Sequence, residues 1–240
     1  MKIYGLQKLT LLDYPGKTAC TIFLGGCNFR CPFCHNASLV LGPDPVQAIA
    51  EEELFSFLKK RVGLLDGICV TGGEPLLSPD LESFLTAVRQ LGYAVKLDTN
   101  GSFPKRLQSL AASGLIDYVA MDIKHAPDFY SDAAGITVGG TALFSSIDES
   151  VHFLLSGAVD YEFRTTLVAE LHREEDMEAI GQWISGAKRY YLQKFVDSGD
   201  LVGARTSSVS FHPVSFSLAR HFCDILRPHI SSASLRGYDQ

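Results

Sequence analysis

Short apolar runs rich in β-branched residues recur along the chain, and turn residues bound each of them. Runs of this kind are typical of strands buried inside a sheet. The run at residues 18–24 ends at Gly25 and Gly26, and the run at 67–71 ends at Gly72 and Gly73. The pattern predicts six strands, at residues 18–24, 67–71, 94–99, 118–124, 161–168 and 189–195.

Between these runs the apolar residues change to a helical spacing. In residues 79–91 they recur every three or four positions and so form one helix face. That face consists of Leu81, Phe84, Leu85, Val88 and Leu91. Ser78 is the expected N-cap, because its hydroxyl can accept a hydrogen bond from the first turn. The same spacing predicts further helices at residues 51–60, 105–112, 141–155, 174–184 and 216–226.

Strands that alternate with helices predict an α/β fold with parallel pairing through right-handed crossovers. The sheet is expected to be open or to form a partial barrel, and ligands bind such folds at the carboxyl ends of the strands. Residues 125–140 are expected to be a long loop, and a Gly/Ser-rich segment begins at residue 197. The residues that follow the strands support a site at this edge, since they are glycines and polar residues at 25–27, 72–75, 98–101 and 122–124.

Composition narrows the class of protein. The chain has 240 residues, of which 46% are hydrophobic and 20% charged, as in an ordinary globular protein rather than a disordered chain or coiled coil. Its net charge of −6 lacks the basic character of proteins that bind nucleic acids or anionic membranes, so neither partner is expected. No signal peptide and no apolar run of the roughly 18 residues needed to span a membrane is visible. A cytoplasmic protein is therefore expected.

Three of the six cysteines lie within eight residues, as Cys27-x3-Cys31-x2-Cys34. Closely spaced thiolates bind zinc or an iron–sulfur cluster. Structural zinc needs a fourth ligand, for which His35 is the nearby candidate. A cubane cluster held by three thiolates instead leaves one iron open to a cofactor. The remaining cysteines are expected to be structural, and these are Cys20, Cys69 and Cys223.

The cysteine triplet, with aromatic Phe33 before its last cysteine, resembles the signature loop of the radical-SAM superfamily. The run Thr71-Gly72-Gly73-Glu74-Pro75 resembles that family's motif for the amino group of S-adenosylmethionine (SAM). Four further segments are similar to the glycyl-radical-activating enzymes, above all to the longer type of anaerobic ribonucleoside-triphosphate reductase activating protein. They are Leu12-Asp13-Tyr14-Pro15-Gly16-Lys17, Cys34-His35-Asn36, Leu97-Asp98-Thr99-Asn100-Gly101 and Met121-Asp122-Ile123-Lys124.

The resemblance covers the chain from about Leu11 to Phe195 and implies a partial (β/α)6 barrel of the radical-SAM type. Residues 1–196 would be the core domain, and residues 197–240 a short C-terminal extension packed on or near it. One 4Fe-4S cluster and SAM are the implied cofactors. The implied reaction is reductive cleavage of SAM to a 5'-deoxyadenosyl radical, which takes a hydrogen atom from a glycine of a partner enzyme. That partner would be an anaerobic ribonucleotide reductase, with flavodoxin or ferredoxin as the low-potential electron donor.

The resemblance also assigns site residues. Cys27, Cys31 and Cys34 would be the cluster ligands. Asp122 and Lys124 would be catalytic, and their alternation on one strand places both on the same face. Glu162 and Arg164 also share a face and would either pair with each other or contact the cofactor. The set expected to bind the cofactor is Phe33, His35, Asn36, Gly72, Gly73, Glu74, Asp98, Thr99, Arg164 and His172.

Two other functions remain open at this point. A radical-SAM enzyme acting on a small molecule would share the same cofactor motifs. A zinc-stabilised interaction module without catalysis would use the same three thiolates and would be colourless.

Overall fold

The computed structural model describes residues 1–42, 48–137, 139–197, 199–206 and 210–238. The chain divides into two compact units. Unit 1 comprises Met1–Asn28, Ser38–Thr99 and Phe103–Ala120, and unit 2 comprises Phe29–Ala37, Asn100–Ser102 and Met121–Gln240. Each unit combines strands with helices, so the α/β prediction is confirmed.

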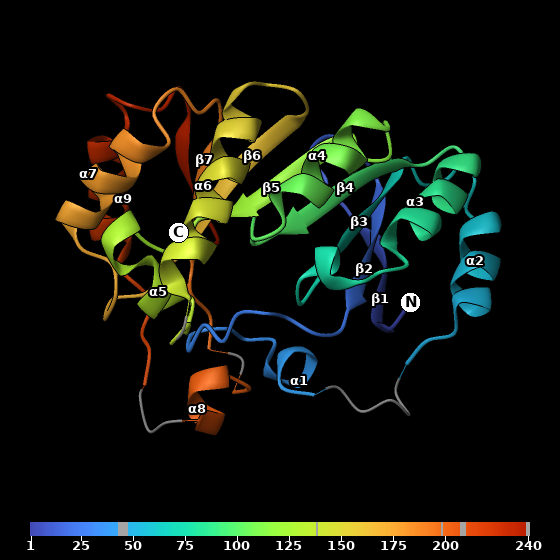
Figure 1. The fold of residues 1–240 in the computed structure, drawn as a ribbon, viewed down its shortest axis with the longest axis horizontal. Coiled ribbons are helices and arrows are strands. Elements are labelled where there is room, and N and C mark those ends of the chain that lie inside the picture. The colour runs from blue at the N-terminus through green and yellow to red at the C-terminus, as the bar shows by residue number, and fades with distance from the viewer. Residues whose placement is uncertain (43–47, 138, 198, 207–209, 239–240) are drawn as a thin grey trace. The chain divides into compact units, whose positions relative to one another are not determined.

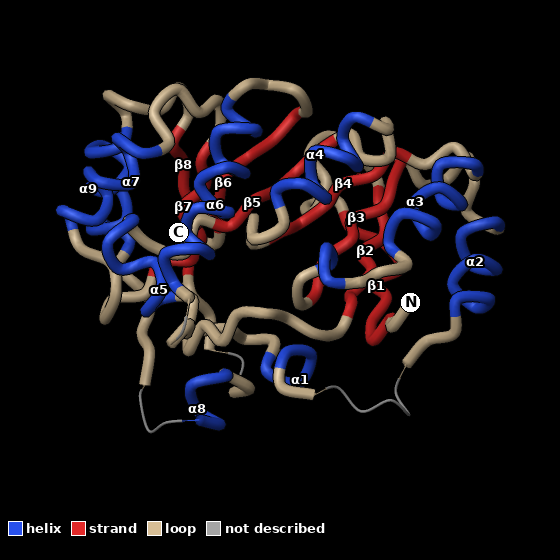
Figure 2. The backbone as a smooth tube through the Cα atoms, in the orientation of Figure 1, coloured by secondary structure: helices blue, strands red, loops and turns tan. Residues whose placement is uncertain are grey.

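Unit 1 is built on a sheet in the order β1-β2-β3-β4 (Figure 1). Strand β1 pairs with β2 in an antiparallel manner, whereas β2, β3 and β4 are parallel. Figure 2 shows α2 and α3 together on one side of these strands. The elements are β1 (Ile3–Thr10), β2 (Ala19–Leu24), α1 (Ala37–Val40), α2 (Glu51–Lys59), β3 (Gly67–Gly72), η2 (Pro75–Leu77), α3 (Leu81–Gln90), β4 (Ala94–Thr99), α4 (Pro104–Ala112) and the start of β5 (Tyr118–Asp122).

Unit 2 contains the parallel order β6-β7-β8. In the register, Phe163 of β6 lies opposite Tyr190 of β7, which in turn lies opposite Ala233 of β8. The elements are η3 (Pro127–Phe129), α5 (Tyr130–Ala133), α6 (Gly140–Leu155), β6 (Asp160–Leu167), α7 (Glu174–Trp183), β7 (Tyr190–Lys194), α8 (Val202–Thr206), α9 (Phe216–Leu226) and β8 (Ala233–Arg236).

The helical spacing in the sequence identifies the buried face of α3 correctly. Its buried residues are Leu81, Phe84, Leu85 and Val88. The predicted N-cap is wrong, because α3 begins two residues later, after Asp80. Ser78 instead ends the short η2 helix, where its backbone N–H donates to the carbonyl of Pro75.

In the described part of the chain, two strands and five short helices were not expected from the sequence; the helices are α1, η2, η3, α5 and α8. β1 carries exposed Gln7 and Lys8, so it is not a continuous apolar run. β8 has only four residues, all half-buried. The stretch 125–140, expected to be a loop, contains η3 and α5. The described part of the chain therefore has eight strands rather than six.

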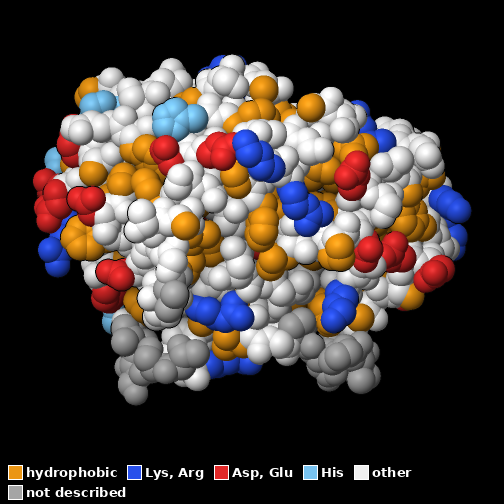
Figure 3. All heavy atoms as spheres, viewed as in Figure 1, with side chains coloured by type: hydrophobic (Ala, Val, Ile, Leu, Met, Phe, Trp, Pro, Cys, Tyr) orange, Lys and Arg blue, Asp and Glu red, His pale blue; other side chains and the backbone are white. Residues whose placement is uncertain are grey.

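The distribution of charged side chains on the surface is consistent with the modest net charge of −6. Acidic and basic side chains are interspersed on the face drawn in Figure 3. None of the helices in the described ranges combines the length and the apolar character needed to cross a bilayer.

Candidate functional site

Two glycines end β3 in unit 1 and bring the following turn against the residues that precede Cys27. Gly72 has φ +116°, and a Cβ there would lie 2.3 Å from the carbonyl oxygen of Leu24. A Cβ on Gly73 would lie 1.9 Å from the oxygen of Gly26. The N–H of Glu74 donates to that same Gly26 oxygen at 2.8 Å. The close approach that these glycines permit in the structure is therefore between two backbone segments of the protein.

Glu74 is buried, with 1% of its surface exposed. Its Oε1 accepts hydrogen bonds from the N–H of Leu76 at 3.0 Å and from the hydroxyl of Thr99 at 2.9 Å. The carboxylate thus caps η2 and links the end of β3 to the end of β4. The structure brings together Glu74 and Thr99, two residues that the sequence assigned to one site.

Asp98 belongs to a buried polar cluster that the sequence did not reveal. The ammonium of Lys96, only 1% exposed, lies 2.5 Å from Oδ1 of Asp98. The thiol of Cys69 lies 3.7 Å from that oxygen and 3.8 Å from the Lys96 ammonium. Alternation along β4 places Lys96 and Asp98 on the same face. Cys69 is therefore part of this polar cluster as well as of the core.

The Asn-Gly pair after β4 forms a turn, as such pairs commonly do. Oδ1 of Asn100 accepts hydrogen bonds from the N–H and hydroxyl of Ser102, at 3.0 and 2.6 Å. Gly101 has φ +78°, and the Ser150 hydroxyl donates to its carbonyl at 2.7 Å. This turn is held by its own side chains and by α6.

Asp122 and Lys124, at and just after the end of β5 in unit 2, form an ion pair. The Lys124 ammonium lies 2.9 Å from Oδ2 of Asp122, and Nε of Arg164 lies 2.9 Å from Oδ1. The N–H of Ile123 donates to the carbonyl of Arg164 at 2.7 Å, which aligns the two segments. Three of the charged residues predicted for the site therefore meet, with Lys124 and Arg164 both on the Asp122 carboxylate.

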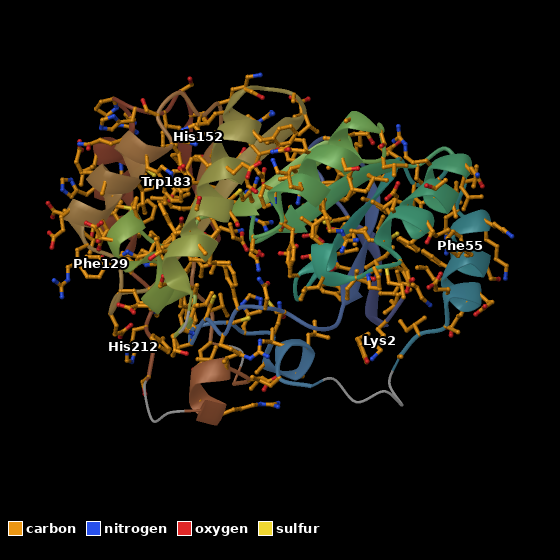
Figure 4. The ribbon with its side chains drawn as sticks, viewed as in Figure 1. Lys2, Phe55, Phe129, His152, Trp183 and His212 are labelled. Carbon is orange, nitrogen blue, oxygen red and sulfur yellow. The ribbon has the colours of Figure 1, made fainter. Side chains whose placement is uncertain are left out.

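Two aromatic side chains support the backbone beside this ion pair. Tyr130, at the start of α5, donates its hydroxyl proton to the carbonyl of Asp122 at 3.2 Å. Its ring packs edge-on against Trp183, labelled in Figure 4, with centroids 5.8 Å apart. The indole N–H of Trp183 donates to Asp148 of α6 at 2.8 Å. These contacts fix the backbone that carries Asp122.

Lys124 keeps its positive charge. Burial works to lower the pKa of the ammonium, but Asp122 and the nearby Cys31 raise it above its usual range. A lysine in this state donates hydrogen bonds and offers a cation; it does not act as a general base. Burial also raises the pKa of Cys34, against the opposing effects of the Asn36 N–H and the Lys124 ammonium. Lys124 therefore acts electrostatically on both Cys31 and Cys34.

The residues of the cysteine loop have the donor chemistry of an iron–sulfur ligand set. Cys27, in unit 1, and Cys31 and Cys34, in unit 2, form no disulfide. Thiolates are the ligands that such clusters use, and no carboxylate interrupts the loop. Within the described ranges, no three His, Cys, Asp or Glu side chains are gathered closely enough to form a ready metal site. The fit to a cluster thus rests on the donor set.

Within unit 2 the loop is ordered by its own backbone. The N–H of Cys34 donates to the carbonyl of Cys31 at 3.0 Å. Phe33, 5% exposed, points into the unit and packs edge-on against Phe211 at 6.5 Å between centroids. His35 is exposed and Asn36 is half-buried. The contacts of these residues with a cofactor stay predictions.

His172, which the sequence assigned to the cofactor, lies in unit 2 between backbone groups and a second histidine. Its Nδ1 accepts from the N–H of Val168 at 3.0 Å, and its Nε2 lies 3.2 Å from the carbonyl of Lys124. The ring stacks on His125, with centroids 5.2 Å apart. Both ring nitrogens therefore bind backbone, and His172 anchors the segment that carries Lys124.

Acid should lower the free energy of unfolding because of His172. Burial, and next the neighbouring His125, lower its pKa to about 4, whereas an unfolded histidine titrates near 6.5. Between these values only the unfolded chain binds the proton. The free energy of unfolding should therefore fall as the pH drops from about 6.5 to 4, by up to about 3 kcal/mol.

Chemical denaturation of the metal-free protein at several pH values measures this dependence. The other groups around the ring are Asp176, 3.8 Å from His125, and Lys124, which faces it through its carbonyl. A His172→Phe variant keeps the stacking, and its slope of unfolding free energy against pH should be smaller by the contribution of about one proton. His152→Phe, on an exposed side chain, should leave that slope unchanged. Equal slopes in the wild type and His172→Phe would refute the assignment.

The sequence reasoning missed several residues of these clusters. Lys96 stands two positions before Asp98 in an otherwise buried strand, which was an available signal. Glu162 is paired with Arg236, and Arg164 with Asp122. No sequence pattern connects residues so distant along the chain.

Comparisons with known proteins identify the family of the chain. Residues 21–142 match the Radical SAM superfamily. A protein of Methanocaldococcus jannaschii provisionally named a glycyl-radical enzyme activating enzyme is 33% identical over 194 residues, which cover 80% of this chain and 79% of that protein. The pyruvate formate-lyase-activating enzyme of Clostridium pasteurianum is 30% identical over 133 residues, or 53% of this chain and 54% of that enzyme.

Solved structures show the same fold. Streptococcus suis SuiB bound to S-adenosylmethionine superposes with a TM-score of 0.66 at 12% sequence identity, over 90% of this chain and 52% of SuiB. The chain therefore belongs to the radical SAM superfamily of enzymes, as a relative of the glycyl-radical enzyme activating enzymes.

Proposed function

We propose that the protein generates a glycyl radical on a partner enzyme, using SAM and a 4Fe-4S cluster held by Cys27, Cys31 and Cys34. The observation that carries the proposal is this set of three cysteines outside disulfides, spaced Cys-x3-Cys-x2-Cys, in a chain of the radical SAM superfamily. The relative that is 33% identical bears the name of a glycyl-radical enzyme activating enzyme. When bound, the cluster and SAM supply a carbon radical that takes a hydrogen atom from glycine.

The protein's own residues would bind and orient SAM. In unit 2, the Lys124 ammonium is held beside Cys31 and Cys34 and can donate to the carboxylate of a ligand. Asp122 restrains that ammonium and is itself restrained by Arg164. The Asp122 carboxylate therefore serves as a positioning group for Lys124.

In unit 1, Glu74 and Asp98 are the carboxylates available to an ammonium group. Each is fixed by contacts of its own, Glu74 by Thr99 and Asp98 by Lys96. A carboxylate that is already oriented loses little conformational freedom when it binds a ligand. Gly72 and Gly73 contribute by placing Glu74 beside the residues that lead to Cys27.

The partner proposed is an anaerobic ribonucleoside-triphosphate reductase, with flavodoxin or ferredoxin as electron donor. The proposal of this partner is supported by the segment Leu12-Asp13-Tyr14-Pro15-Gly16-Lys17 and its resemblance to the longer type of reductase-activating protein. Exposed Leu11 and Leu12, at 68% and 86%, are available to a partner surface. The proposed location is the cytoplasm, where such partners are found.

The test is anaerobic reconstitution with iron and sulfide, reduction, addition of SAM and measurement of 5'-deoxyadenosine. The expected result is a brown protein with close to four irons per chain that forms 5'-deoxyadenosine, measured against a Cys31→Ala background. A colourless protein with one zinc would refute the proposal, as would a yield no higher than that background.

A second measurement addresses the partner. Mixing the active protein with an anaerobic ribonucleotide reductase from the same cell should produce a glycyl radical detectable by electron paramagnetic resonance. A signal only with pyruvate formate-lyase would move the assignment to that partner. Cleavage of SAM without a radical on either enzyme would favour a small-molecule substrate.

A further inference from the structure

The segment after β7 in unit 2 contacts the cysteine loop through its backbone. The N–H of Val202 donates to the carbonyl of Cys34 at 3.0 Å, and the N–H of Gly203 donates to the carbonyl of Pro32 at 2.7 Å. In return, the N–H of Ala37 donates to the carbonyl of Asp200 at 3.4 Å. The first turn of α8 therefore binds the loop on both sides of Phe33.

Side-chain packing adds to the contact between α8 and the cysteine loop. A Cβ on Gly203 would lie 2.7 Å from the Pro32 oxygen and 3.1 Å from the ring of Phe211. Phe211 is 6% exposed and packs against Phe33. Leu201 and Val202 are also buried, at 3% and 1% exposed. Glycine is thus required at position 203 by the closeness of two backbones, since a side chain there would push them apart.

The cysteine loop needs such support because it lacks regular secondary structure. Backbone groups buried in such a loop need hydrogen-bond partners from other segments of the chain. Within unit 2 the loop is also held by the Cys34–Cys31 turn and by the bond from the N–H of Arg30 to the carbonyl of Ala134, at 2.9 Å. The bonds from α8 fall on Pro32 and Cys34, in the C-terminal half of the loop.

We propose that residues 200–206 and Phe211 form a clamp that holds the Cys31–Cys34 part of the loop in place for the iron–sulfur cluster. The inference rests on the proposed function, since it assigns the clamp to a cluster held by these cysteines. Gly203 is a positioning residue, which acts on the ligand Cys34 through Pro32. A loop held in this way before the cluster arrives spends less conformational entropy on binding it. The C-terminal extension would accordingly control how firmly the cluster is retained.

Gly203→Val tests the clamp, with Ala204→Val on the exposed side of the same helix as matched control. In the metal-free, reduced protein, alkylation of Cys31 by iodoacetamide, followed by peptide mass spectrometry, should be at least about tenfold faster in Gly203→Val than in Ala204→Val. Cys20 and Cys223, both buried, serve as internal references and should react at unchanged rates. Unchanged reference rates separate local opening of the loop from general loosening of the fold.

The reconstituted protein gives a second readout. Release of iron to a chelator should be about tenfold faster in Gly203→Val, and the paramagnetic resonance spectrum of its reduced cluster should broaden. If Gly203→Val does not fold, Gly203→Ala replaces it under the same criteria. Alanine normally favours a helix over glycine, so loosening of the loop by that change would point specifically to the contact with Pro32.

Rates for Cys31 alkylation and iron release within twofold of Ala204→Val would overturn the proposal. So would equal acceleration of Cys31, Cys20 and Cys223, which would mean general destabilisation. If Cys31 is exposed as expected but the wild type neither holds a cluster nor cleaves SAM, the contact between α8 and the loop is real. In that case the proposed function, rather than the clamp, has failed.

Discussion

Replacing Lys96 by methionine is expected to lower the free energy of unfolding by about 3–5 kcal/mol, because it leaves a charge without its buried partner. The ammonium is 1% exposed and lies 2.5 Å from the Asp98 carboxylate, which is itself largely covered. Methionine fills similar space but cannot neutralise Asp98. Denaturant unfolding of the metal-free protein measures the loss, and Lys59→Met on an exposed side chain should stay within about 0.5 kcal/mol of the wild type.

A double variant separates the cost of a lone charge from the value of the pair. Replacing both partners of a buried ion pair with apolar residues is often nearly neutral. Lys96→Met with Asp98→Leu should therefore recover most of the stability lost by Lys96→Met alone. If the double variant is as unstable as the sum of the single changes, then the pair is not coupled and Asp98 has other support. Cys69, 3.7 Å from that carboxylate, would be the first residue to test next.

The charged pairs of the candidate site show which contacts can be predicted from the sequence and which cannot. Alternation along a strand places Asp122 beside Lys124, and the structure confirms that they meet, at 2.9 Å. The same rule places Lys96 beside Asp98, yet a lone lysine in a strand does not reveal that it is buried. Local periodicity fixes which face a side chain occupies. It cannot identify the partner that another strand brings to that face, as with Arg164 and Asp122.

For the fold too, some elements were predicted from the sequence and others were missed. The strands buried on both faces were found because they are continuous apolar runs, and α9 was placed at 216–226 as observed. β1 was missed because its exposed Gln7 and Lys8 interrupt the pattern, as expected of an edge strand. β8 was missed because its four residues include Ser234 and Arg236. Arg236 is tolerated there because Tyr191 of β7 and Glu162 of β6 bind its guanidinium.

Residues predicted to form the C-terminal extension contact both the cysteine loop and the sheet of unit 2. Its first helix, α8, binds the cysteine loop, and its last strand, β8, extends the sheet of β6 and β7. Arg236 of β8 reaches over the ring of Tyr191, 3.5 Å from its centroid, to Glu162 of β6. Glu162 and Arg164 share one face of β6, so the contact made by Arg236 lies on the same face as the Arg164–Asp122 pair.

Replacing Arg236 by methionine is expected to cost about 3–5 kcal/mol of unfolding free energy, since it removes a bidentate partner from a buried carboxylate. Both guanidinium–carboxylate distances are 2.8 Å, and the Glu162 side chain is 0% exposed. Arg227→Met is the control, because that arginine pairs with Asp224 at the surface, where a pair contributes at most about 1 kcal/mol. A loss in Arg236→Met no larger than in Arg227→Met would contradict the assignment.

Loss of Arg236 should also reach Asp122 through Arg164. With Glu162 deprived of its cation, Arg164 is the arginine two positions along the same face, about 7 Å away in a strand. If Arg164 turns to Glu162, Asp122→Asn should destabilise the Arg236→Met protein less than it destabilises the wild type. Non-additivity of about 1 kcal/mol or more in that cycle would show the exchange. Strict additivity would mean that Arg164 stays on Asp122, and that β8 stabilises the sheet without influencing the ion pair beside Cys31 and Cys34.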